Sequence, residues 1–159
     1  MTLESDPSGL ADDGPLNTVD ALVQLSFLIH RIVSAAGAEH ELSVIQIRLL
    51  GILRDRRAGM VELGRHLGLD KSSMTGLVGR AEKRGLVERT PSPYDGRAVL
   101  VTLTPGGRRL AGQCADEIGR RVGALTDELP AARRAQLTEL AASLLRARRP
   151  GPGAGEQSL

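Results

Sequence analysis

The chain has 159 residues, a formal net charge of +2, one cysteine and two aromatic side chains, Phe27 and Tyr94. That length suits one domain with an added oligomerisation element, and a single cysteine excludes an intramolecular disulfide. The start of the chain is acidic and lacks the apolar core of a secretory signal, and no uninterrupted run of roughly 18 apolar residues predicts a membrane span. These features predict a cytoplasmic protein.

Charge is divided unevenly along the chain. Residues 1–47 hold one arginine against seven acidic residues, residues 48–97 hold eleven basic against six acidic residues, and residues 98–159 hold nine against six. The middle segment is therefore the most basic, which favours a polyanionic partner. Because single-strand binders stack bases on aromatic side chains, the scarcity of aromatic residues argues against single-stranded nucleic acid.

The first predicted element follows an acidic tail, residues 1–16, whose proline, glycine and acidic residues predict disorder. Asn17 or Thr18 can cap a long helix that ends near Gly37, within a segment of residues 17–41. Its apolar residues are too widely spread to be buried on one side only. We expect one side to face its own domain and the other to face a partner chain.

A second helix begins at Ser43, which forms a capping box with Gln46. It opens the segment of residues 42–104. Gly59 then turns the chain into a short helix over residues 61–67. Met60 stands at the expected N-cap, where its thioether is a poor substitute for a hydroxyl, so we expect a weak helix start.

A third helix runs from Asp70 to Gly85, which are suitable N-cap and C′ residues. Apolar side chains recur at the helical period, at Met74, Leu77, Val78 and Ala81. The opposite face is small, polar and basic, and it carries no acidic residue. Its two glycines each lower helix propensity by about 1 kcal/mol, and they either permit close approach to a groove or have no role.

Two β-rich runs, residues 86–90 and 98–103, predict a hairpin after this helix. The tip between them is marked by prolines and carries Asp95 and Arg97. A stiff loop that projects an arginine suits insertion into the minor groove of DNA. Helix, turn, helix and hairpin together predict a winged helix-turn-helix.

Thr104 and Pro105 can cap and start the next helix. Apolar residues then follow heptad spacing, which predicts a seam for another helix, at Ala111, Ala115, Ile118, Val122, Leu125 and Leu129. Pro130 ends this seam and starts a last helix within residues 105–149. Residues 150–159 are predicted to be a flexible tail.

Four short runs within residues 42–110 resemble the MarR family of bacterial transcriptional regulators: Asp-Lys-Ser-Ser, Glu-Lys-Arg-Gly-Leu-Val, Asp-Gly-Arg-Ala and Leu-Thr-Pro-Gly-Gly. The resemblance implies a mostly α fold with a small β-hairpin wing, and a homodimer formed by the N- and C-terminal helices. It also implies a pseudo-palindromic double-stranded DNA operator and a repressor. A small-molecule effector would bind between the dimer helices and the winged helix, with no required cofactor.

Ten residues are predicted to contact DNA. Small and hydroxyl-bearing residues at the start of the third helix can reach base edges or phosphates, and basic residues further along can bind phosphates. On the wing, Asp95 is expected to orient Arg97 by a charge-assisted hydrogen bond, and Arg89 to support Asp95 or bind phosphate. The set is Ser72, Ser73, Thr75, Gly76, Arg80, Lys83, Arg84, Arg89, Asp95 and Arg97.

Other interpretations stay open. His30 and His40 could take part in a metal site, against the simpler interpretation of an exposed acidic link. Cys114 could sense oxidants, against a buried structural cysteine, which we favour because the sequence gives no mark of a low-pKa thiol. A dimeric winged helix that binds a protein instead of DNA is a further alternative. No catalytic motif is present in the sequence, so we predict that the protein is not an enzyme.

Overall fold

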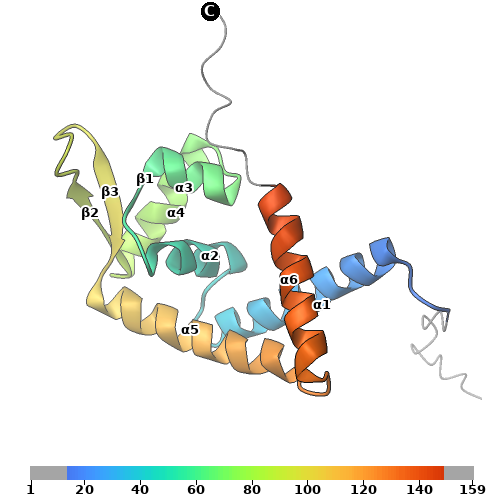
Figure 1. Ribbon diagram of the computed structural model, residues 1–159. Coiled ribbons are helices and arrows are strands. Elements are labelled where there is room, and N and C mark those ends of the chain that lie inside the picture. The colour runs from blue at the N-terminus through green and yellow to red at the C-terminus, as the bar shows by residue number, and fades with distance from the viewer. Residues whose placement is uncertain (1–13, 149–159) are drawn as a thin grey trace, which may run out of the picture.

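Residues 14–148 are described by the computed structural model shown in Figure 1. The predictions of a disordered tail over residues 1–16 and a flexible tail over residues 150–159 lie largely or wholly outside this range. The elements in chain order are α1 (Thr18–Ala38), α2 (Val44–Leu53), β1 (Ala58–Gly59), α3 (Met60–Leu67), α4 (Lys71–Lys83), β2 (Val87–Pro91), β3 (Val99–Leu103), α5 (Pro105–Ala124) and α6 (Ala131–Ala147). The predicted fold class, mostly α with a β-hairpin wing, is confirmed.

The core is aliphatic and lies where α2, α3, α4, α5 and the sheet meet. Its largest fully buried side chains are Leu49, Leu50, Leu53, Leu63, Met74, Leu77, Val78, Val87 and Val101. Neither aromatic side chain takes part, since Phe27 is 66% exposed and Tyr94 is 97% exposed. The predicted apolar stripe of α4 therefore packs inward as expected, which turns the opposite face of that helix outward.

The wing is part of a three-stranded antiparallel sheet with the order β1-β3-β2. Val87 pairs with Leu103 at the base of the hairpin, and Pro91 pairs with Val99 towards the tip. The third strand, β1, pairs Ala58 with Val101 and was not predicted. Two residues are too few to produce an alternating pattern that sequence reasoning could detect.

Local capping sets most helix starts as predicted. Ser43 and Gln46 form the expected capping box on α2. The Thr104 hydroxyl accepts a hydrogen bond from the amide of Gly107 at 3.0 Å, and Pro105 occupies the first turn of α5. These bonds satisfy amides that have no partner within the helix.

Two details of the prediction are wrong. Met60 is the first residue of α3, and Gly59 before it occupies the N-cap position without a side-chain bond. The helix α5 ends at Ala124, so Leu125 is its C-cap and Leu129 lies in the turn before α6. Heptad spacing continued through this turn, and spacing alone gives no sign of where the backbone leaves the helix.

The helices α1 and α6 lie at the end of the described structure opposite the wing (Figure 1). The helix α6 has no buried residue, and α1 exposes Val19, Leu22, Val23, Leu25 and Phe27. Among the described helices, α1 alone is long and apolar enough to cross a membrane by length and composition, with a mean hydropathy of 1.4 over its most apolar window. Length and composition do not separate such a span from a helix that a partner subunit covers.

Candidate DNA-binding surface

The start of α4 presents its small polar residues to solvent. The Asp70 carboxylate accepts a hydrogen bond from the amide of Ser73 at 2.7 Å and caps the helix. This amide, and then the Ser73 hydroxyl, hold the pKa of Asp70 below its ordinary value. Because the folded-state pKa is the lower one, the cap contributes stability near neutral pH and loses it as the pH falls through that pKa. Ser72, Ser73 and Thr75 are exposed.

The Thr75 hydroxyl donates to the carbonyl of Lys71 at 2.8 Å. Its proton is thus used within the helix, and the exposed side chain keeps its acceptor lone pairs and its methyl group for other contacts. Contacts of Thr75 with DNA would therefore use acceptor or apolar chemistry, such as an adenine amino group or a thymine methyl group.

The glycine at position 76 makes room for a basic side chain on α4. A Cβ atom placed on Gly76 would lie 3.1 Å from the Nη1 atom of Arg80, so the Arg80 guanidinium lies back over the glycine. Gly79 has no such neighbour within 4 Å. Arg80 and Lys83 are both exposed.

Arg84 is also exposed, but its guanidinium binds the link that follows α1. Its guanidinium donates to the carbonyl of Glu41 at 2.8 Å and to the carbonyl of His40 at 3.0 Å. Both acceptors lie in the link between α1 and α2. The sequence analysis predicted Arg84 to bind phosphate and did not predict these two hydrogen bonds.

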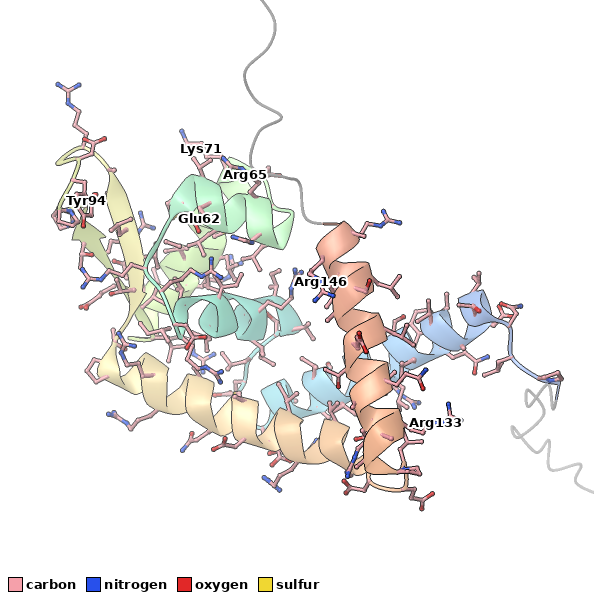
Figure 2. All side chains as sticks on the ribbon, in the orientation of Figure 1. Glu62, Arg65, Lys71, Tyr94, Arg133 and Arg146 are labelled. Atoms are coloured by element: carbon pink, nitrogen blue, oxygen red, sulfur yellow. The ribbon has the colours of Figure 1, made fainter. Side chains whose placement is uncertain are left out.

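The wing tip is a hydrogen-bonded turn. Asp95 accepts a hydrogen bond from the backbone amide of Arg97 at 3.0 Å. The predicted bond between the two side chains is wrong, because the carboxylate shapes the turn and does not hold the guanidinium. The Arg97 side chain is exposed, and within residues 14–148 it makes no ion pair. Figure 2 shows Tyr94 on the same wing. Tyr94 is not among the ten predicted DNA contacts, although a loop tip flanked by prolines is normally exposed and its side chain is indeed exposed.

Arg89 of β2 forms an ion pair with Glu82 of α4. Its Nε atom lies 3.4 Å from a carboxylate oxygen of Glu82, so the predicted support of Asp95 by Arg89 is wrong. Sequence reasoning could not find this pair, since Glu82 comes from α4 and Arg89 from β2.

A groove of about 720 Å³ lies between α3, α4 and the wing. Basic side chains from all three parts border it: Arg65, Lys71 and Arg89. Arg65 and Lys71 stand on the same upper surface in Figure 2, and neither is in the predicted set of ten. From the sequence, Arg65 on the helix before α4 could also reach the DNA backbone, whereas Lys71 had no signal beyond the basic middle segment as a whole.

The candidate sensing residues do not form a site. Within residues 14–148, no group of three or more His, Cys, Asp or Glu side chains could hold a metal ion, His30 and His40 included. Cys114 is buried, and burial first and the charge of Glu39 second raise the pKa of its thiol. A thiol with a raised pKa is mostly protonated and reacts slowly with oxidants.

A capped helix whose polar face is exposed, preceded by a short helix and followed by a hairpin wing, defines a winged helix-turn-helix protein. The family model described as "MarR family" matches residues 40–98. The HTH-type transcriptional repressor Rv2887 of Mycobacterium tuberculosis is 33% identical over 104 residues, which cover 65% of this chain and 73% of that protein. The chain belongs to the MarR family. This is a family of transcription regulators, in agreement with the prediction that the protein is not an enzyme.

The multiple antibiotic resistance protein MarR of Escherichia coli is 42% identical over 60 residues, which cover 38% of this chain and only 42% of that relative. The crystal structure of its apo form superimposes with a TM-score of 0.69 at 28% identity, covering 83% of this chain and 99% of that one. Two structures share the fold at lower identity. The repressor CouR, bound to a 23-mer DNA duplex, has a TM-score of 0.70 at 24% identity, and the match covers 82% of this chain and 93% of CouR. NadR, in complex with 4-hydroxyphenylacetate, has a TM-score of 0.68 at 23% identity, and the match covers 82% of this chain and 94% of NadR.

Proposed function

We propose that this protein is a cytoplasmic, homodimeric repressor that binds a specific pseudo-palindromic site on double-stranded DNA. The observation that carries the proposal is the exposed cationic surface formed by α4 and the wing. On it, Arg80 and Lys83 project from one helix, and Arg97 projects from a stiff tip without an ion-pair partner in the described part of the chain. Cations without local partners are available to neutralise phosphates.

The proposed contacts divide by chemistry. Ser72, Ser73 and Thr75 are placed to meet base edges at the start of the recognition helix, since its first residues enter the major groove in helix-turn-helix proteins. Arg80 and Lys83 would bind phosphates along the groove. Arg97 would reach the neighbouring minor groove, whose negative potential attracts an arginine. Asp95 acts indirectly by fixing the backbone from which Arg97 projects.

The homodimer is supported by the apolar surface that one chain leaves uncovered. Leu140, Leu144 and Leu145 on α6 are 59%, 56% and 72% exposed, and α1 exposes five further large apolar residues. A second copy of the chain would cover both helices by a symmetric contact. Two linked recognition helices would then bind two half-sites, which multiplies the contacts of one helix.

Release by a small molecule is a second part of the proposal. A cavity of about 480 Å³ lies between α2 and α5, which supports the expectation of an effector site between the dimer helices and the winged helix. Its walls are mostly aliphatic, and among the described residues that line it Arg54 has the one charged side chain. An amphipathic anion would fit this chemistry. It would weaken operator binding only if it bound more tightly to the conformation that fits DNA poorly.

The experiment that tests the DNA-binding proposal is selection of genomic fragments by the purified protein, followed by footprinting on the selected duplex. We expect two protected half-sites whose centres lie about 10 base pairs apart, roughly one helical turn. If no fragment is enriched over a control resin at low salt, the protein-binding alternative of the same winged helix replaces this proposal.

A further inference from the structure

The helices α1 and α4 end in the same type of turn. In α4, the amide of Leu86 donates to the carbonyl of Ala81 at 3.0 Å, and Gly85 has a φ of 67°. In α1, the amide of Leu42 donates to the carbonyl of Gly37 at 2.9 Å, and Glu41 has a φ of 54°. This bond, from the residue after a single left-handed residue to the carbonyl five residues earlier, is the Schellman motif.

A left-handed conformation is unusual for glutamate, and in residues 14–148 Glu41 is the one residue other than glycine that adopts it. Such a conformation persists where surrounding contacts hold it. The contact that can do so here is with Arg84, whose two terminal nitrogens donate to the carbonyls of His40 and Glu41. Those carbonyls lie at the end of α1, where no further helical amide can reach them.

The charge of Arg84 suits this position as well. A helix carries a partial negative charge at its C-terminus, and a cation placed there is stabilising. The last described turn of α1 has no basic residue of its own. Arg84, more than forty residues later in the chain, therefore supplies the cation that the last turn of α1 lacks.

The end of α4 is also held by α5. The Thr104 hydroxyl donates to the carbonyl of Gly85 at 2.5 Å, and a Cβ atom on Gly107 would lie only 1.9 Å from the carbonyl oxygen of Leu86. On the other side of the junction, Glu39 forms an ion pair with Arg121 of α5. The ends of α1 and α4 are thus joined to each other by Arg84 and to α5 by separate contacts.

We propose that Arg84 is a positioning residue that fixes the recognition helix to the end of α1, and that it does not bind DNA phosphate. This inference rests on the proposed function, in which α1 belongs to the dimer contact and α4 reads DNA. Two of the five N–H donors of Arg84, one on each terminal nitrogen, are used by these carbonyls, so a phosphate on this side of the guanidinium would compete with them. Held as it is, Arg84 sets the position of each α4 relative to the dimer, and so the spacing between the two recognition helices.

The test compares Arg84→Lys and Arg84→Ala with the matched pair Arg80→Lys and Arg80→Ala. The probe is a duplex that the wild-type protein selects from a random pool, titrated at several salt concentrations. A lysine keeps the charge but has no planar fork to bind two carbonyls at once. We expect both Arg84 variants to bind roughly tenfold more weakly, with the salt dependence of Arg84→Lys unchanged from wild type. For Arg80, lysine should restore most of the affinity, and alanine should reduce the salt slope by about one per protomer.

A second readout separates positioning from general loss of stability. On duplexes whose half-sites are moved apart by one base pair, the wild-type protein should bind markedly more weakly, whereas Arg84→Lys should lose most of this preference. If Arg84→Lys binds as tightly as wild type and Arg84→Ala lowers the salt slope, Arg84 is a phosphate ligand and the inference is wrong.

Hydrogen exchange of the free protein makes the test independent of DNA binding. The amide of Leu42 should exchange at least tenfold faster in Arg84→Lys than in wild type, while amides in α6 should not change. An unchanged exchange rate of the Leu42 amide would show that Arg84 does not hold the end of α1, and the inference would be wrong. Failure of the wild-type protein to bind any selected duplex would instead reject the proposed function.

Discussion

Replacing Leu140 and Leu144 on α6 by glutamate is expected to convert the proposed dimer to monomers and to abolish specific duplex binding. The two leucines are one helical turn apart and more than half exposed in a single chain. Each gains about half of the roughly 1.5–3 kcal/mol that full burial of such a side chain provides, so four of them contribute on the order of 3–6 kcal/mol to one dimer. Burying carboxylates in their place would be unfavourable in addition.

The measurement for this double variant is sedimentation velocity over a range of protein concentrations, together with circular dichroism to verify the helices. Val61→Glu is the matched control, because Val61 on α3 is 74% exposed and lies outside the proposed dimer contact. It should stay a dimer. If the double variant sediments like wild type, α6 is not part of the interface, and the explanation for its uncovered leucines fails.

Arg97→Ala is expected to weaken duplex binding by about 10- to 100-fold, which corresponds to roughly 1–3 kcal/mol. The loss should appear without loss of stability, because the Arg97 side chain is exposed and has no ion-pair partner in the described part of the chain. Only its backbone amide is used, by Asp95, and alanine keeps that amide. Dimer formation and the thermal unfolding midpoint should therefore match those of wild type.

The control for Arg97 is Arg133→Ala, which removes the same charge from the start of α6. Figure 2 shows Arg133 at the end of the molecule opposite the wing. Binding of the selected duplex is compared by fluorescence anisotropy at one fixed salt concentration, because affinity depends steeply on salt. Equal affinities for the two variants would mean that Arg97 acts only through net charge, and the wing would lose its role in recognition.

The features predicted correctly from the sequence are those whose partners are close in the chain. The Asp70 cap, the Ser43 capping box and the Thr104 cap each join residues three apart, so the side-chain chemistry largely determines the bond. The apolar stripe of α4 followed from the helical period in the same way. Local patterns were therefore sufficient to predict the winged helix-turn-helix.

The details that sequence reasoning missed depend on residues brought together by folding. Arg84 was predicted to bind phosphate, but its acceptors lie 43 and 44 residues earlier in the chain. Arg89 was expected to support Asp95 or to bind phosphate, and in the structure it pairs with Glu82 on another element. Exposed basic residues of a helix look alike in a sequence, and only the packing of α4 against the link after α1 separates Arg84 from Arg80.

The salt dependence of duplex binding by the wild-type protein tests the proposed function most directly. Five basic residues are exposed on α3, α4 and the wing, so the proposed dimer would offer ten cations to one duplex: Arg65, Lys71, Arg80, Lys83 and Arg97. If about half of them neutralise phosphates, the logarithm of the association constant should fall linearly with the logarithm of salt concentration, with a slope of roughly −4 to −5. No detectable binding at about 50 mM salt, or a slope near zero, would contradict DNA binding by this surface.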